Sequence, residues 1–153
     1  DSDKFADLIE NPQNDIVVWS YRNNYTSYRN PDMYSWLDVD GDDVKGVSVK
    51  KFTGDNPVDE YAIVGTMFFR NKDVYLNSLK QTYEKDIRTN GEFYVDSILN
   101  EAIALGYNVK NFEVDHYICW GTPNDLKTYR YWQNFFNAVN WHPYDYRKDY
   151  LTY

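Results

Sequence analysis

The spacing of apolar positions along the chain predicts four helices. In four segments, apolar residues recur every three or four positions, which is the pattern of a helix with one buried face. These segments run from 5 to 9, from about 71 to 86, from 95 to 103 and from 122 to 139. The last one opens with Thr122-Pro123-Asn124-Asp125, where a hydroxyl, a proline and an acid stand in the order of a capping box.

Apolar runs and alternating patterns predict five strands. The run from 61 to 69 is apolar almost throughout, as expected for a strand that is covered on both faces of a sheet. Asp40-Gly41 is a turn signal and predicts a β-hairpin. In the last strand, alternation places His116 on the apolar, buried face, whereas the polar stretch from 21 to 31 fits neither period and predicts a loop. The five strands cover 15–19, 34–39, 44–51, 61–69 and 112–120.

Helices and strands alternate along the chain. This order indicates the α/β class, with a mixed sheet, flanking helices and a β-hairpin. Residues 1–140 are expected to form one domain. The remaining residues, 141–153, are rich in tyrosine and charge, and we expect this aromatic tail to pack on the domain.

Charge, hydropathy and cysteine content exclude several partners. The chain has 153 residues, with 16 Lys and Arg against 24 Asp and Glu and a formal net charge of -8. This is the opposite of the basic surface that binds nucleic acid, and no apolar run approaches the roughly 20 residues that span a bilayer. We therefore expect neither nucleic acid nor a membrane as a partner. The sequence does not decide whether the chain forms an oligomer. The single cysteine, Cys119, excludes an internal disulfide and favours the cytoplasm.

Aromatic residues make up 19% of the chain, with 16 Tyr, 8 Phe and 5 Trp. Such residues commonly fill cores, but exposed aromatic rings also form contact surfaces for ligands such as sugars. One interpretation of the function is therefore a noncatalytic carbohydrate-binding or interaction module.

Three local patterns indicate residues that can bind a ligand. Lys50 and Lys51 end the second hairpin strand, where a lysine can neutralise a phosphate; a solvated strand end is the alternative. Glu92 precedes the third predicted helix and can accept hydrogen bonds from ligand hydroxyls or interact with the helix dipole. Gly121 leads from a strand into a helix N-terminus, where N–H groups attract anions.

Four motifs, taken together, resemble one enzyme family. In their order and spacing they resemble the second half of the sugar-phosphate nucleotidyltransferases, such as the glucose-1-phosphate thymidylyltransferase and mannose-1-phosphate guanylyltransferase group. The resemblance covers about residues 5 to 137. The motifs are Gly46-Val47-Ser48-Val49-Lys50-Lys51, Tyr61-Ala62-Ile63-Val64-Gly65, Gly91-Glu92-Phe93-Tyr94-Val95-Asp96 and Trp120-Gly121-Thr122-Pro123-Asn124-Asp125-Leu126.

The resemblance implies the C-terminal, acceptor-binding part of a Rossmann-like nucleotidyltransferase fold. Such an enzyme forms an NDP-sugar and pyrophosphate from an NTP and a sugar 1-phosphate, with Mg2+, and several members serve surface polysaccharide synthesis. The Gly-rich loop with Arg and Lys that begins the family's nucleotide half does not occur in this sequence. Because that loop stabilises the charge on the transferring phosphoryl group, we expect the nucleotide to be bound through a missing N-terminal half. This chain is expected to be inactive by itself.

The resemblance also implies substrate-binding roles for individual residues, whereas the catalytic residues stay unknown. Two positions depart from the family: Val49 replaces a Glu that holds sugar hydroxyls, and Cys119 replaces an Asp that binds magnesium. Because of Val49, nucleotidyl transfer to a non-sugar phosphorylated small molecule is a further alternative. The implied substrate-binding residues are Lys50 or Lys51 at the sugar phosphate, the backbone of Ile63 and Gly65 beside the sugar, Glu92 at a hydroxyl, and Gly121 in the last motif.

Overall fold

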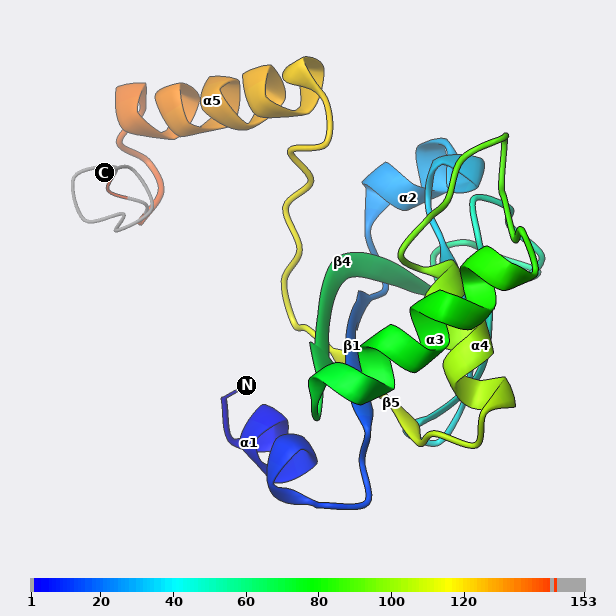
Figure 1. Ribbon diagram of the computed structural model, residues 1–153. Coiled ribbons are helices and arrows are strands. Elements are labelled where there is room, and N and C mark those ends of the chain that lie inside the picture. Colours follow the sequence, from blue (N-terminus) through cyan, green and yellow to red (C-terminus); the bar gives the residue numbers. More distant parts are fainter. Residues whose placement is uncertain (1, 144, 146–153) are drawn as a thin grey trace. The chain divides into compact units, whose positions relative to one another are not determined.

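The computed structural model describes residues 2–143 and 145, which belong to two units (Figure 1). The first unit ends at Tyr117 and the second begins at Ile118, and each is described by itself. The first unit contains α1 (Ser2–Glu10), β1 (Ile16–Tyr21), α2 (Tyr25–Arg29), η1 (Pro31–Met33), β2 (Trp36–Asp40), β3 (Asp43–Ser48), β4 (Tyr61–Phe69), α3 (Lys72–Glu84), α4 (Ser97–Ala104) and β5 (Val109–Glu113). The second contains α5 (Pro123–Ala138).

The five strands form a mixed sheet, as the sequence predicted. Their order is β1-β4-β2-β3-β5, and β5 pairs again with β1, so that the sheet closes on itself. The β1–β5 pair is parallel and the other pairs are antiparallel. Closure between β3 and β5 rests on one residue pair, Asp43 opposite Lys110, whose side chains form an ion pair.

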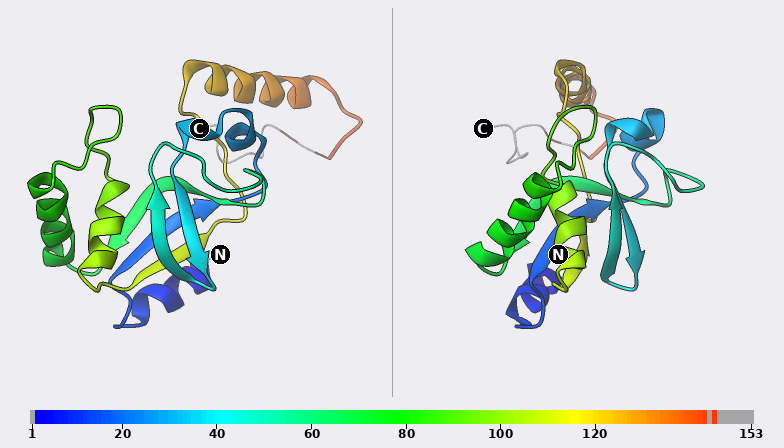
Figure 2. Two further views of the ribbon diagram at one scale, coloured as in Figure 1. Left: turned by 90° about the vertical axis from the view of Figure 1, so that its right-hand side faces the viewer. Right: turned by 45° about the vertical axis from the view of Figure 1, so that its right-hand side comes forward.

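The sheet is covered on both faces at β1, which explains the apolar run of that strand. The predicted covering of 61–69 on both faces is only partial, because Gly65 and Thr66 of β4 are exposed. On one face, α3 and α4 lie side by side (Figures 1 and 2) and bury a core that includes Ile16, Val18 and Leu99. On the other face, Phe5 of α1 packs against Trp19, with the ring centroids 4.5 Å apart. Burial of both faces of β1 therefore fixes its apolar sequence.

The predicted hairpin is confirmed, and a bulge bends it. Asp40 lies opposite Asp43, so that Gly41 and Asp42 form a two-residue turn. Gly41 has a φ of +62°, which a glycine adopts without strain. The register then shifts next to Asp38, and the Asn100 side chain of α4 holds the β3 edge through both its oxygen and its nitrogen.

Three sequence predictions are corrected by the structure. The last strand is Val109–Glu113 and not 112–120, because its partner β1 ends at Tyr21 and offers no further ladder. His116 therefore lies outside any strand and is exposed, not buried. The predicted loop after β1 contains the short helix α2, whose first turn is capped by Asn24.

The second unit consists mainly of α5, whose predicted capping box is present. Thr122 and Asp125 exchange side-chain and backbone hydrogen bonds at its start. At its end, Phe135 and Phe136 lie against Trp141 and His142. Residues 144 and 146–153 lie outside the described part, so packing of the tail on the domain stays a prediction. None of the described helices is long and apolar enough to cross a bilayer.

Candidate functional site

The end of the hairpin and the segment before α4 bring Lys50 and Glu92 close together. The ammonium of Lys50 lies 5.5 Å from the centre of the Tyr94 ring, and the hydroxyl of Tyr94 donates a 3.0 Å hydrogen bond to Glu92. Tyr94 therefore connects two residues that are 42 positions apart in the sequence. We call Lys50, Lys51, Glu92 and Tyr94 the lysine cluster. Tyr94 belongs to one of the four motifs, but the sequence did not predict it as a site residue.

The two lysines in the turn after β3 have different surroundings. Lys50 adopts a φ of +53°, and its ammonium donates a 2.5 Å hydrogen bond to the carbonyl of Met33. Ser48 and Phe52 brace the turn: the Ser48 hydroxyl donates to the carbonyl of Lys51, and the Phe52 N–H donates to Asp32. Lys51 is exposed, and its ammonium has no hydrogen bond or ion pair within the described residues.

The electrostatics of the lysine cluster favour a hydroxyl-binding carboxylate. The hydrogen bond to Glu92 raises the pKa of Tyr94, because the neutral phenol is the form that donates. Tyr94 thus uses one acceptor position of Glu92 and leaves the others exposed to solvent. Nearby, the Ser35 hydroxyl donates to Asp96 and fixes the entry to α4.

The two β4 residues of the predicted site occupy different environments. Ile63 is buried in the core, and its N–H donates to the carbonyl of Ser35, so that this N–H serves the sheet. Gly65 lies in a bulge, where the register passes from Ser20 opposite Ile63 to Val18 opposite Met67. Gly65 is exposed and has a φ of +104°. This conformation, and not a lack of space, requires glycine, because a Cβ there would meet no atom within 4 Å.

Gly121 belongs to the second unit and is described apart from the other five predicted residues. Its N–H lies 3.5 Å from the sulfur of Cys119. The following N–H, of Thr122, donates to Asp125, so that a carboxylate of the chain itself occupies this helix N-terminus. A role for Gly121 in substrate binding stays a prediction.

The described residues do not fit a magnesium ion. Magnesium prefers carboxylate and water oxygens, whereas the thiol of Cys119 is a soft ligand. Among residues 2–143 and 145, no group of three or more His, Cys, Asp or Glu side chains is placed to hold a metal. We therefore derive no step through magnesium.

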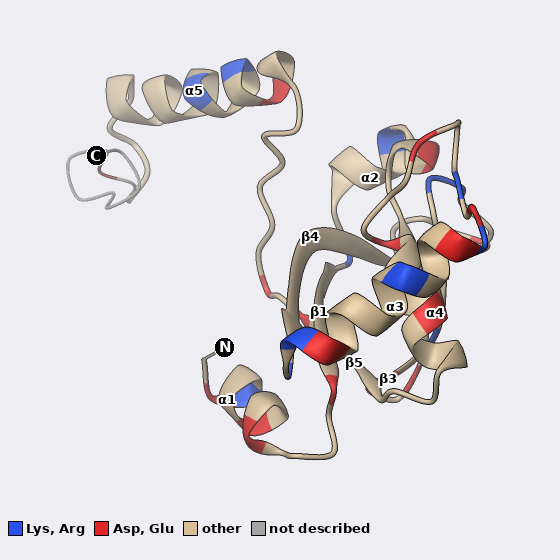
Figure 3. Cartoon of the chain, viewed as in Figure 1, with Lys and Arg blue, Asp and Glu red and all other residues tan. Residues whose placement is uncertain are grey.

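The charged residues show a second feature that the sequence analysis missed. Figure 3 shows that several elements of the first unit carry both acidic and basic residues, and one pair joins the carboxyl ends of the parallel strands β1 and β5. The guanidinium of Arg22 makes two hydrogen bonds to Glu113 and lies 4.3 Å from the centre of the Tyr61 ring. The hydrogen bonds to Glu113 raise the pKa of Arg22. The pair stabilises the edge of the sheet at which ligands bind in α/β folds.

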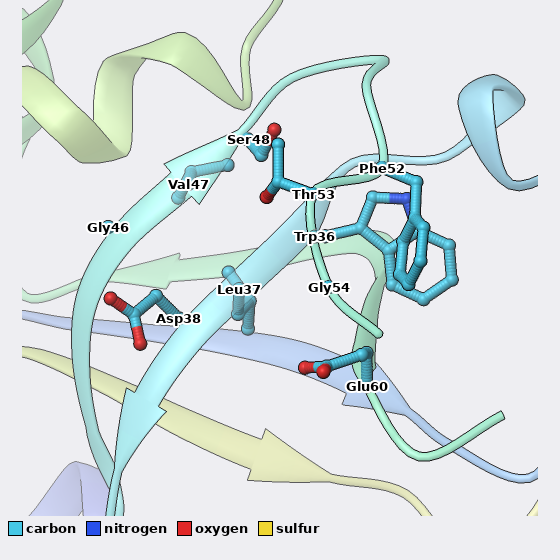
Figure 4. Close-up of a pocket in the computed structure, with 10 residues that line it drawn as sticks. All are labelled: Trp36, Leu37, Asp38, Gly46, Val47, Ser48, Phe52, Thr53, Gly54 and Glu60. Atoms are coloured by element: carbon cyan, nitrogen blue, oxygen red, sulfur yellow. The ribbon is translucent and has the colours of Figure 1, made fainter. Parts of the chain in front are cut away.

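A pocket of about 450 Å³ opens on the hairpin (Figure 4), and no residue of the lysine cluster lines it. None of the six sequence-predicted residues lines it. The two-residue alternation of β2 predicts Trp36 and Asp38 on one face, but no sequence pattern predicts that the loop after β3 encloses that face.

Comparison with solved structures finds nucleotidyltransferases. The nucleoside-diphosphate-sugar pyrophosphorylase from Vibrio cholerae RC9 superimposes with a TM-score of 0.59 and 20% identity, over 76% of this chain and 46% of that chain. The CMP:2-keto-3-deoxy-manno-octonic acid synthetase complexed with CTP superimposes with a TM-score of 0.52 and 15% identity, over 86% and 54%. The chain thus spans about half the length of each and has a similar fold. No protein-family model and no curated protein sequence matches the chain.

Proposed function

We propose that this chain is the acceptor-binding half of a nucleotidyltransferase that forms an NDP-sugar and pyrophosphate from an NTP and a sugar 1-phosphate. The observation that carries the proposal is the lysine cluster, in which the ammonium of Lys50 lies over the ring of Tyr94 and the hydroxyl of Tyr94 binds Glu92. The exposed Lys51 follows Lys50 directly in the chain. The similarity of the fold to two nucleotidyltransferases supports it.

Within this proposal, the two lysines have different roles. Lys51 binds the phosphate of the acceptor, because its exposed ammonium can approach an anion as a point charge. Lys50 positions the segment that carries Glu92, since its ammonium already contacts the carbonyl of Met33 and the ring of Tyr94. Glu92 accepts hydrogen bonds from acceptor hydroxyls. The exposed backbone of Gly65 lies beside the acceptor, and the nucleotide is bound by residues outside this chain.

The acceptor class can be tested by titrating the chain with glucose 1-phosphate, glycerol 3-phosphate and glucose. A sugar-phosphate site requires glucose 1-phosphate to bind most tightly and Lys51→Ala to weaken that binding. Tighter binding of glycerol 3-phosphate would support the alternative, nucleotidyl transfer to a non-sugar phosphorylated molecule. Failure of both phosphates to bind would contradict the proposal. In the natural protein, pyrophosphate release with a panel of NTPs tests the transfer reaction itself.

One observation favours a second candidate, a noncatalytic carbohydrate-binding module. Several aromatic side chains are at least half exposed, and they are able to contact sugar rings. A glycan-binding module would bind neutral oligosaccharides without a phosphate, with a change in tryptophan fluorescence that Lys51→Ala leaves unaltered. The aromatic side chains that are at least half exposed include Tyr25, Trp120, Tyr131 and Trp141.

A further inference from the structure

The strands β2 and β3 contribute six residues to the lining of the pocket on the hairpin, namely Trp36, Leu37, Asp38, Gly46, Val47 and Ser48. Trp36 lies opposite Ser48 and Asp38 lies opposite Gly46, so these four positions share one face of the pair. Because Gly46 has no side chain, the space opposite Asp38 stays open. The resulting volume of about 450 Å³ lies within the range of small-molecule sites.

The loop after β3 encloses this face. Phe52 packs on Trp36, with the ring centroids 4.8 Å apart and the planes at 68°. Thr53, Gly54 and Glu60 continue the wall, and Figure 4 shows the carboxylates of Asp38 and Glu60 on the two sides of the space in front of Leu37. Three segments, 36–38, 46–48 and 52–54, therefore build the pocket together with Glu60.

The charge of the lining has one sign. Its two ionisable residues are Asp38 and Glu60, and none of its residues is Lys, Arg or His. Neither carboxylate has a hydrogen bond or ion pair with any residue that the structure describes. Carboxylates that border a cavity without a protein partner are acceptors for a ligand that carries the missing positive charge.

We propose that this pocket binds a small organic cation with N–H donors, such as a protonated amine. A phosphate or carboxylate ligand would meet two like charges there. A neutral sugar would leave both negative charges uncompensated, and Trp36, which forms the base of the pocket, is only 4% exposed. The ring of Phe52 is accessible and adds a favourable face for a cation. This inference does not depend on the proposed nucleotidyl transfer.

The side chain of Glu60 packs closely against Gly54. A Cβ added at Gly54 would lie 2.6 Å from the Oε1 atom of Glu60 and 2.8 Å from its Cδ. Because the backbone at Gly54 does not have a positive φ, an alanine there would displace the Glu60 carboxylate without straining the chain. Gly54→Ala is therefore a probe of the position of Glu60 and not of its charge.

The test uses two probes of nearly the same shape that differ in charge, benzylamine, which is protonated at neutral pH, and benzyl alcohol. Each is titrated into the isotope-labelled 153-residue chain, and the amide and indole N–H signals of Trp36, Gly46 and Gly54 are followed by NMR. Benzylamine is expected to shift these signals saturably and to bind about tenfold more tightly than benzyl alcohol. Asp38→Asn and Glu60→Gln are each expected to remove most of that preference. Asp55→Asn, an exposed acid of the same loop outside the lining, is the matched control and should change nothing.

Three results would overturn the assignment. Equal affinity for benzylamine and benzyl alcohol would show an apolar site without charge selection. Tighter binding of glucose than of benzylamine would show a sugar site. Unchanged benzylamine binding in both Asp38→Asn and Glu60→Gln would place the cation elsewhere. Glucose 1-phosphate, titrated separately, reports on Lys51 and not on these signals, so failure of the acceptor proposal can be distinguished from failure of this one.

Discussion

The lysine cluster and the hairpin pocket are built by neighbouring residues and have opposite charge. The lysine cluster presents the ammonium of Lys51 to solvent, whereas the pocket presents only the carboxylates of Asp38 and Glu60. A turn with a positive φ at Lys50 lies between the two regions in the sequence, and neither lysine lines the pocket. The two proposals therefore assign an anion to the end of the hairpin and a cation to its face.

The largest effect is expected from the bulge in β4. Gly65→Ala should destabilise the chain by about 1–3 kcal/mol, because a φ of +104° strains any residue with a Cβ. It should also weaken binding of glucose 1-phosphate, while benzylamine binding in the folded protein stays unchanged. Urea unfolding and the two titrations measure both effects.

The matched control for this substitution is Gly46→Ala. Gly46 has an ordinary φ, and the nearest atom to an added Cβ is 4.0 Å away, so stability should change little. The extra methyl group would instead lie at the pocket and affect only benzylamine binding. If Gly46→Ala destabilised the chain as much as Gly65→Ala, backbone strain at the bulge would not be the cause.

The next largest effect is expected on glucose 1-phosphate binding, and it distinguishes the roles of Lys50 and Lys51. Lys51→Ala is expected to weaken glucose 1-phosphate binding about tenfold, the effect of losing one charge-assisted contact, without changing the free energy of unfolding. Lys45→Ala, an exposed lysine of the same hairpin that pairs with Asp43, is the control and should leave binding unchanged. A larger loss of binding in Lys50→Ala than in Lys51→Ala, at equal stability, would reverse the assigned roles.

A smaller effect is expected at the pocket. Gly54→Ala displaces Glu60 but keeps its charge, so benzylamine binding should fall about threefold, less than the loss from removing a charged partner. Glucose 1-phosphate binding should not change. NMR titration of both ligands with this variant shows whether position or charge alone controls the pocket.

The smallest effect concerns the tip of the hairpin, away from both regions. Hydrogen bonds from Lys110 and Lys45 lower the pKa of Asp43 below its usual value. Its contribution to stability is therefore present above the unfolded pKa of about 3.9 and is lost as the pH falls through the lower folded value. Since the group is half exposed, Asp43→Asn should cost about 0.5 kcal/mol at neutral pH and nothing in strong acid. Unfolding curves across this pH range measure the difference, and neither ligand should be affected.

Much of the fold could be predicted because local patterns decide it. The run from 61 to 69 coincides with β4, and the capping box at Thr122 and Asp125 is present at the start of α5. The strand β5 was misplaced because alternation continues after Glu113, while the length of a strand depends on its partner. Closure of the sheet could not be predicted either, since it depends on a single residue pair between two strands that are far apart in the sequence.

The candidate site could be predicted in part. The motifs identified Lys50 and Glu92, and the structure connects these two residues through Tyr94. The turn that contains both lysines has a positive φ at a non-glycine residue, Lys50, which no spacing pattern reveals. The hairpin pocket depends on how the loop after β3 folds back, a long-range feature that leaves no periodic trace in the sequence.

The most direct test of the central claim is a titration of the isotope-labelled chain with glucose 1-phosphate, followed by NMR. We expect saturable shifts at Lys51, Gly65, Glu92 and Tyr94 and no shift at Gly46. In Lys51→Ala, the shifts at Gly65, Glu92 and Tyr94 should saturate at about tenfold higher ligand concentration. Shifts that are centred on Gly46 and Trp36, or no saturable shift at all, would contradict the assignment of the lysine cluster as the acceptor site.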